Sequence, residues 1–551
     1  MVRDPFLKAL TPMSSTRLNP LDAAWLFTET RATPNHVGGL LQFRLPPDAP
    51  KDFMRQLMTE FRNHRKFTAP WNRKLKYAFN MNPVAEWVED RNIDLEYHVR
   101  HAALPWPGGE RELGELVGRL QSTPIDLTRP PWECTLIEGL EGNRFALFIK
   151  MHHSLIDGVS GVKLLQRAMA STAAASLELP PFWASGAAPR ASQAARHPEA
   201  LMPTVTHAVA GAMQEITMQA KTVPQLVAAF GKMAKSAMAP DGDGMVVPFS
   251  APISVLNGRV REKRRFATQR FSMERLRAVA TAAGCTLNDV VLAICGGALR
   301  RFLDERKALP GKSLTAGIPV SVRPKDDDGA GNAISFIIST LGTDIADPVA
   351  RLDAIRASVK HAKEHVQSLP RQAMMQYTVL LMAPTILTLL TGVGGRTRPM
   401  FNITISNVPG PEKPLYFRGA ELLATYPASI VTHGQAVNIT CQSYAGFMNF
   451  GYTGCHSSVP SMQRLAVYTG EALQELEDAV LPKAITAGKA PRRKPARAAA
   501  TPENKPASSK LAAPKPAARK VASPVRPESA QKPAALRRAK AAGASAKTAA
   551  A

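Results

Sequence analysis

The pattern of hydrophobic and polar positions predicts a mixed α/β chain. In the first part, runs rich in β-branched and aromatic residues predict strands at 37–45, 134–138 and 145–151. Apolar residues three and four positions apart predict amphipathic helices at 52–65 and 111–121. Only a short loop separates the last two strands, so we expect them to form a hairpin.

A second α/β stretch begins near residue 252. Apolar runs predict its strands at 266–271, 315–321, 333–340, 401–406, 437–442 and 446–451. Helical spacing predicts helices at 273–283, 286–303 and 461–480. Thr286 opens the second of these and is a plausible N-cap. Because strands alternate with helices in both stretches, we expect an α/β protein with two domains.

Two further apolar segments could either pack within the protein or contact a lipid surface. Residues 199–239 show helical spacing, which is typical of helices that bridge two domains or, less favoured, of a helix on a lipid surface. Residues 377–393 are uncharged and contain Pro384. Their length is at the short limit for a bilayer span, so we expect a kinked helix that is buried or associated with a surface.

Charge is concentrated at the C-terminal end. From Lys483 onward the chain has 17 Lys and Arg against Glu503 and Glu528, so +15 of the net charge of +25 lies there. Almost no large apolar residue accompanies these charges, and we expect this tail to be disordered. It could be a solvated tail, or it could bind anionic membrane surfaces or nucleic acid by charge alone.

Length and composition limit the remaining possibilities. A chain of 551 residues exceeds one ordinary core, and we place domains at 1–180 and 251–482, joined by 181–250 and followed by the tail, 483–551. The five cysteines are scattered and form no metal-binding pattern, which fits buried thiols in a reducing compartment. The N-terminus lacks the apolar segment of a secretory signal, so we expect a cytoplasmic protein.

The candidate chemistry lies where the strand at 145–151 ends. His152 and His153 follow it, and Asp157-Gly158 predicts a tight turn before the next helix. Successive strand residues point to opposite faces, so only one histidine can face a given cleft. A histidine there is the residue type that general-base catalysis needs, although a histidine pair can also end a strand without any chemistry.

The residues His152-His153-Ser-Leu-Ile-Asp157-Gly158 match the HHxxxDG motif of the CoA-dependent acyltransferase superfamily, which includes chloramphenicol acetyltransferase and condensation domains. The chain further resembles the bacterial wax ester synthase/diacylglycerol acyltransferase family over most of 15–480. The matching stretches begin at Pro20, His36, Pro130, Leu287, Pro319, Gly331, Thr343, Ser406 and Asn438. It departs from the family pattern at Pro131, where Leu is common, and near Cys455, where an acidic residue is absent.

The resemblance implies two chloramphenicol-acetyltransferase-like domains with the active site in a tunnel between them. It implies transfer of a long-chain fatty acyl group from acyl-CoA, a co-substrate, to diacylglycerol or a fatty alcohol, with no cofactor or metal. It also implies a protein at the periphery of the inner membrane or of lipid inclusions. The basic tail, 483–551, lies outside the part of the chain that resembles the family.

The resemblance also assigns roles to residues. His153 is expected to be the general base and His152 its supporting neighbour, while Asp157 is expected to fix the loop through an ion pair. Asn288 is a candidate donor to the oxyanion, or else a residue that merely starts a helix, and Asp289 is expected to be structural. Two alternatives stay open: an acyltransferase of the same superfamily with another hydroxyl acceptor, and a lipid-granule or nucleoid-binding protein.

Overall fold

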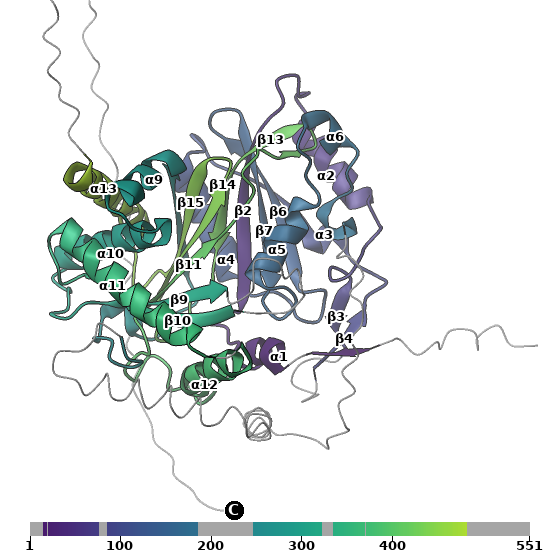
Figure 1. The fold of residues 1–551 in the computed structure, drawn as a ribbon. Coiled ribbons are helices and arrows are strands. Elements are labelled where there is room, and N and C mark those ends of the chain that lie inside the picture. Colours follow the sequence, from purple (N-terminus) through teal and green to yellow (C-terminus); the bar gives the residue numbers. More distant parts are fainter. Residues whose placement is uncertain are drawn as a thin grey trace, which may run out of the picture. The chain divides into compact units, whose positions relative to one another are not determined.

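Two six-stranded sheets form the framework of the protein, and helices pack around them (Figure 1). The computed structural model describes residues 15–18, 20–76, 85–185, 246–321, 334–369 and 371–481. These residues belong to one contact unit, 1–484. The predicted tail and residues 186–245 of the linker, which include the segment 199–239, lie outside the described residues, so the proposed domain boundaries stay predictions.

The first sheet holds the histidine motif. Its strands, in spatial order, are β12 Tyr416–Phe417, β13 Ala420–Ala428, β2 His36–Arg44, β7 Arg144–His152, β6 Trp132–Leu140 and β5 Val99–Ala103. The predicted hairpin is confirmed as β6–β7, and it turns through Gly142 and Asn143, both at positive φ. β7 is buried along nearly its whole length, which explains why it reads as a continuous apolar run.

The second sheet has the order β10 Ile334–Thr340, β9 Thr315–Ser321, β11 Ile403–Val408, β14 Val437–Tyr444, β15 Phe447–Cys455 and β8 Arg264–Ser272. A small third sheet joins β1 Thr16–Arg17, β4 Glu86–Glu89 and β3 Arg73–Leu75. Each strand predicted for the second stretch is present, with ends shifted by a few residues. The α/β class is therefore confirmed.

One strand crosses between the two halves of the chain. β13 comes from the second half but pairs antiparallel with β2 in the first sheet, from Glu421 opposite Arg44 to Ala428 opposite Gly38. Its burial alternates strictly, as expected for a strand with one face in the core. The sequence analysis did not predict this strand, because its alternating positions include small alanines and Pro427.

The helices of the first half are α1 Pro20–Phe27, α2 Phe53–Asn63, α3 Leu95–His98, α4 Glu110–Ser122, α5 Gly158–Gln166 and α6 Ala173–Leu177. α4 packs between the sheets: Gly114 and Gly118 lie against the backbone of β8, and Leu113 and Val117 share a core with Phe148 of β7. A Cβ at Gly114 would come within 2.9 Å of a β8 carbonyl oxygen, so this close approach requires glycine.

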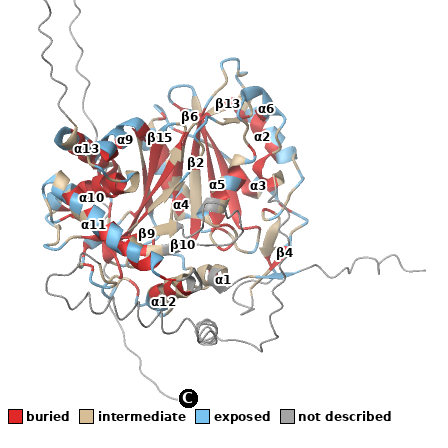
Figure 2. Ribbon diagram, in the orientation of Figure 1, coloured by how far each residue is buried: buried red, intermediate tan, exposed pale blue. Residues whose placement is uncertain are grey.

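The second half has α9 Met273–Ala282, α10 Leu287–Glu305, α11 Pro348–Gln367, α12 Arg371–Leu390 and α13 Met462–Val480. α10 is buried along most of its length, and Figure 2 shows it among the most enclosed helices. α11 was not predicted, although Asp347 caps it and Pro348 occupies its first turn. Its apolar stripe is interrupted by many charged residues, so the helical spacing is weak.

The uncharged segment at 377–393 forms most of α12, and Pro384 lies inside this helix. This agrees with the expected proline-containing helix. Among the described helices, none alone has the length and hydrophobicity of a membrane span, although α9 and α10 together pass the same test with a 99° bend between them.

Candidate active site

The end of β7 directs its two histidines into different surroundings. His152 is fully buried and pairs across the sheet with His36 of β2. His153 is the first residue beyond the strand and keeps part of its surface accessible. The strand geometry thus separates an enclosed histidine from one that a substrate could reach.

Both ring nitrogens of His152 are engaged. The backbone N–H of Ser154 donates to Nδ1 over 3.2 Å, and the Ser154 hydroxyl lies 2.6 Å from the same nitrogen. Since Nδ1 accepts, the ring proton is on Nε2, which donates to Oε2 of Glu29 over 2.6 Å. His152 therefore has no free lone pair with which to take a proton from a substrate.

His153 has the opposite arrangement. Its backbone N–H donates to the carbonyl of Asn35 over 2.9 Å, and its ring lies 4.3 Å from the ring of Trp25, centroid to centroid. No hydrogen bond from another described residue reaches its ring nitrogens. Burial lowers the pKa of His153 to about 4, although the carboxylate of Asp157 opposes this shift. The imidazole is consequently neutral at pH 7 and can accept a proton.

Asn35 joins the end of α1 to both histidines. Its side-chain amide donates to the carbonyl of Trp25 over 2.7 Å and to the hydroxyl of Thr28 over 3.0 Å. Its backbone N–H donates to Oε2 of Glu29 over 3.0 Å, while its carbonyl accepts from His153. Asn35 therefore binds the backbone of Trp25, whose ring lies against His153, and the carboxylate that binds His152.

The sequence analysis missed Glu29 and Asn35 as site residues. Both lie in the segment between α1 and β2, close to residues that carry the family resemblance. A carboxylate and an amide in a loop have many ordinary roles, however, and the contact of Glu29 with His152 spans 123 positions of sequence. Only the folded chain reveals that partnership.

Asp157 caps α5. Its Oδ1 accepts from the backbone N–H of Ser160, and its Oδ2 accepts from the hydroxyl of Ser160, each over 2.8 Å. We expected an ion pair here, but Asp157 forms none with the described residues. It holds the loop by capping the helix, and its charge acts on His153 through space.

Among the described residues, no hydrogen bond connects Asn288 to the network of the two histidines, Glu29 and Asn35. It occupies the first turn of α10 and is half-buried. Within the described ranges, no hydrogen bond joins Asn288 to either histidine, so its oxyanion role stays a prediction. Asp289 is structural: its Oδ2 accepts from the backbone N–H and the hydroxyl of Thr286, completing the capping box of α10.

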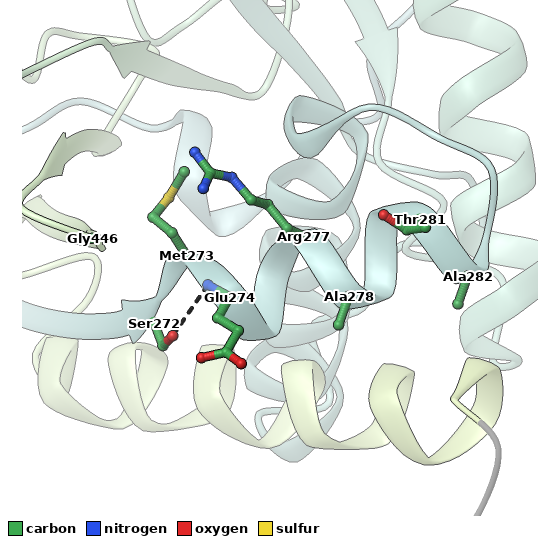
Figure 3. Close-up of a pocket in the computed structure, with 8 residues that line it drawn as sticks. All are labelled: Ser272, Met273, Glu274, Arg277, Ala278, Thr281, Ala282 and Gly446. Atoms are coloured by element: carbon green, nitrogen blue, oxygen red, sulfur yellow. Dashed lines mark hydrogen bonds between the residues drawn. The ribbon is translucent and has the colours of Figure 1, made fainter. Parts of the chain in front are cut away.

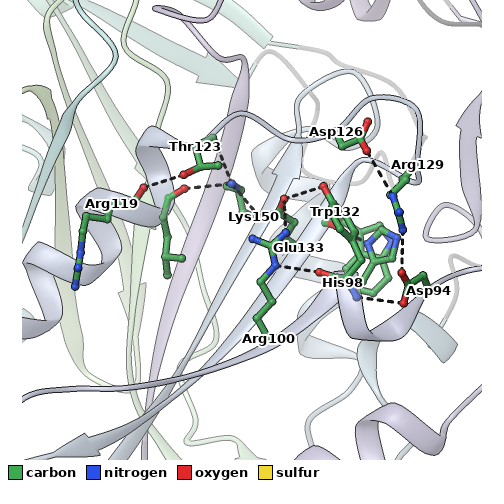
Figure 4. Close-up of polar contacts among 12 residues, drawn as sticks. Asp94, His98, Arg100, Arg119, Thr123, Asp126, Arg129, Trp132, Glu133 and Lys150 are labelled. Atoms are coloured by element: carbon green, nitrogen blue, oxygen red, sulfur yellow. Dashed lines mark hydrogen bonds and ion pairs between the residues drawn. The ribbon is translucent and has the colours of Figure 1, made fainter.

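A buried ion pair lies two residues before His152 (Figure 4). The ammonium of Lys150 is 3.1 Å from Oε2 of Glu133 and donates to the carbonyls of Leu120 and Thr123 at the end of α4. Arg100 contacts the other oxygen of Glu133. This network ties α4 to the strand that carries the histidines.

His36 also packs against α4. Its Nε2 donates to the carbonyl of Gln121 over 3.0 Å, and the amide of Gln121 donates back to the carbonyl of His36. Burial lowers the pKa of His36 well below its usual value. His36 is thus a neutral core residue of β2.

Two cavities lie away from the histidines. One, a depression of about 720 Å³, runs along α9 and is lined by residues such as Ser272, Met273 and Arg277 (Figure 3). It contains none of the predicted site residues. A second cavity, of about 20 Å³, lies among residues of β10, α11 and α12. The described residues contain no group of three side chains suited to a metal ion. The predicted tunnel stays a prediction.

The comparisons with known proteins identify the family of the chain. Residues 18–291 match the wax ester synthase/diacylglycerol acyltransferase catalytic domain, and residues 330–477 match the C-terminal domain of the same family. A Mycobacterium tuberculosis protein named as a diacylglycerol O-acyltransferase is 44% identical over 497 residues, covering 84% of this chain and 98% of the relative. The O-acyltransferase WSD of Acinetobacter baylyi is 37% identical, with 84% and 97% covered.

Solved structures give the same result. The wax ester synthase/diacylglycerol acyltransferase of Marinobacter aquaeolei superposes with a TM-score of 0.68 at 36% identity, covering 84% of this chain and 99% of that one. A condensation domain of the CDA synthetase shares the fold alone, with a TM-score of 0.50 at 15% identity over 84% of this chain and 97% of that domain. The chain therefore belongs to the wax ester synthase/diacylglycerol acyltransferase family, as the histidine motif and the ordered matching stretches predicted.

Proposed function

We propose that this acyltransferase transfers a fatty acyl group from long-chain acyl-CoA to the hydroxyl of diacylglycerol or of a long-chain fatty alcohol, with His153 as the general base. The observation that carries the proposal is the contrast between the two histidines. His152 has both ring nitrogens occupied, whereas His153 is neutral, partly accessible and held by its backbone and by Trp25.

The proposed reaction is a direct transfer. An alcohol is a poor nucleophile at neutral pH, so Nε2 or Nδ1 of His153 accepts its proton as the oxygen attacks the thioester carbonyl. The tetrahedral intermediate then collapses, the C–S bond breaks, and the imidazolium returns the proton to the CoA thiolate. The ester and free CoA are the products, and no acyl-enzyme or cofactor is required.

Asp157 and Glu29 act on the two histidines in different ways under this proposal. The Asp157 carboxylate favours the charged form of His153, which stabilises the imidazolium that forms during the transfer. Glu29 keeps His152 in a single tautomer and thereby fixes the strand end from which His153 projects. Asn288 is proposed as the donor to the oxyanion, on the family resemblance alone.

The proposed acceptors are almost insoluble in water, so the reaction must take place at a lipid surface. We accordingly propose a cytoplasmic protein bound to the periphery of the inner membrane or of lipid inclusions. The family membership supports this location, because diacylglycerol and long-chain alcohols dissolve in those phases.

The decisive test measures thiol release from palmitoyl-CoA by the purified chain, with hexadecanol and with dioleoylglycerol in parallel. Free CoA together with ester product is expected with at least one acceptor, and the ratio of the two rates gives the preferred acceptor. Folded protein that releases no thiol with either acceptor would overturn the proposal and favour another hydroxyl acceptor.

The basic tail supports a second, additional function. Its 17 Lys and Arg against two Glu suit a tether to lipid granules or to nucleic acid. Deleting residues 484–551 should alter localisation in cells while leaving the thiol-release rate unchanged. A matching loss of turnover would make the tail part of the catalytic unit and contradict a separate tether.

A further inference from the structure

Exposed apolar side chains gather on one part of the second half. Eight large apolar residues of the described chain are exposed, and five of them lie in two segments, 246–259 and 387–393. Ile253 is 75% exposed, Leu387 54%, Val255 48% and Val393 38%. The other exposed residues, Trp106, Leu177 and Val467, lie on separate elements. Exposed apolar residues that cluster in this way mark an interaction surface, whereas single scattered ones are ordinary.

The two segments adjoin in the fold. The guanidinium of Arg259 donates to the carbonyl of Gly392 over 2.7 Å, and the amide of Asn402 donates to the carbonyl of Pro252 over 2.7 Å. The backbone N–H of Phe249 donates to the carbonyl of Met400. These bonds hold the chain before β8 alongside the end of α12 and the loop that follows it.

Arginines lie in the same two segments as these apolar residues or just after them. Arg259, Arg261, Arg396 and Arg398 are all exposed, and none of them forms an ion pair with a described residue. The sequence has no Asp or Glu in 246–261 or in 370–411. We call the four arginines together with Ile253, Val255, Leu387 and Val393 the docking face.

We propose that the docking face binds the surface of an anionic lipid layer. Apolar side chains gain free energy when they enter the boundary between headgroups and acyl chains, and arginines beside them bind the phosphates. The phosphates of a nucleic acid would bind the arginines, but the four apolar side chains would stay in water. The combination of both chemistries therefore favours lipid.

The docking face leads toward the catalytic histidines. From Arg261 the chain continues to Arg264, whose guanidinium is buried and donates to the carbonyl of Ala32. Ala32 lies in the loop between Glu29 and Asn35, the two residues that hold the histidines. The inference rests on the proposed function in one respect: an acceptor dissolved in lipid would enter from this face.

The test measures binding of the full chain to vesicles, without acyl-CoA. Vesicles of phosphatidylcholine with phosphatidylglycerol are compared with vesicles of phosphatidylcholine alone, in low and in high salt. High salt suppresses attraction by exposed charge, including that of the tail, so that the apolar contribution can be measured separately. Because no turnover is required, this assay gives a result whether or not the proposed acyl transfer is correct.

In the triple variant Ile253→Ser/Leu387→Ser/Val393→Ser, the fraction bound in high salt should fall at least about tenfold. The double variant Arg396→Gln/Arg398→Gln should lose affinity for the anionic vesicles in low salt. Leu177→Ser/Val467→Ser removes two exposed apolar residues elsewhere and should bind as the parent chain does. Far-UV circular dichroism checks that each variant is folded.

Two results would overturn the proposal. One is a folded triple variant that binds vesicles as the parent chain does. The other is an equal loss in the Leu177→Ser/Val467→Ser control, which would show that general surface hydrophobicity decides binding. Within the first result, a loss that is confined to the arginine variant and is equal for a duplex oligonucleotide would identify the face as a general polyanion contact.

Discussion

Nε2 of the buried His152 lies 2.6 Å from Oε2 of Glu29, a residue of the segment that joins α1 to β2. The same oxygen accepts the backbone N–H of Asn35, whose carbonyl holds the backbone of His153. The two histidines are neighbours in sequence, yet both ring nitrogens of His152 are hydrogen-bonded, whereas no other described residue bonds to the ring nitrogens of His153. This division of roles makes the following predictions specific.

Replacing His153 by Ala should lower kcat by about 10²- to 10⁴-fold, the usual contribution of a general base, while the fold is retained. His152→Ala should lower kcat less, because His152 takes no proton from the substrate. Thiol release and circular dichroism of both variants check this. Near-parental activity in both variants would remove the histidines from the mechanism.

Glu29→Gln should lower kcat about tenfold with little change in KM, because the amide no longer demands the Nε2–H tautomer of His152. The free energy of unfolding should fall by about 1–3 kcal/mol, the cost of disturbing a buried hydrogen bond to a charged group. Glu115→Gln on the exposed face of α4 serves as the control and should change neither quantity appreciably. A change in KM with an unchanged kcat would contradict the assigned role.

Trp25 should set the pH dependence of the reaction. Burial lowers the pKa of His153 to about 4, so activity should persist well below pH 6.5 on the acid side. Trp25→Ala admits water to the ring, and the acid limb of the kcat/KM profile should move upward toward pH 6.5. Trp25→Phe keeps a covering ring and should leave the limb nearer its parental position. An unmoved limb in Trp25→Ala would show that other residues desolvate His153.

Stability should decline on mild acidification. Burial lowers the pKa of His36, His98 and His153 in the folded state, so below pH 6.5 the unfolded chain binds more protons than the folded one. Their contribution is complete above pH 6.5 and is lost as the pH falls. The shift of His153 to about 4 should cost about 1–2 kcal/mol between pH 7 and 5, and His36 and His98 should add to this loss. Urea unfolding at both values measures this, and His36→Gln should reduce the difference.

Lys150→Ala should destabilise the fold by about 3–5 kcal/mol, because it leaves the buried carboxylate of Glu133 without its nearest cation and removes two hydrogen bonds to α4. Adding Glu133→Gln should restore part of the loss. Lys74→Ala breaks the more exposed pair with Asp90 and should cost less than about 1 kcal/mol. Equal losses for Lys150→Ala and Lys74→Ala would contradict the importance of burial.

Much of the fold could be predicted from local patterns. β7 and β6 are long apolar runs around a short turn, and α10 begins at a threonine with an aspartate three residues later. These signals lie within single elements, where side-chain spacing decides the structure. The position of the histidine pair at a strand end follows from the same patterns.

What could not be predicted depends on contacts between distant segments. β13 is defined by its pairing with β2, and the role of Glu29 is defined by a histidine 123 positions away. Asp157 was assigned an ion pair where the structure has a helix cap, because a carboxylate before glycine fits either role. No spacing rule identifies such partners.

The pairing of β13, from the second half of the chain, with β2, from the first half, has a consequence for synthesis of the protein. A nascent chain that has emerged only as far as α11 already contains both histidines, but the edge of β2 that β13 later covers is still open. The two histidines are then attached to an unfinished sheet that is prone to pairing with other chains. Proteolytic fragments that end before Ala420 should accordingly aggregate and lack activity, so the cell gains a working enzyme only from a nearly complete translation.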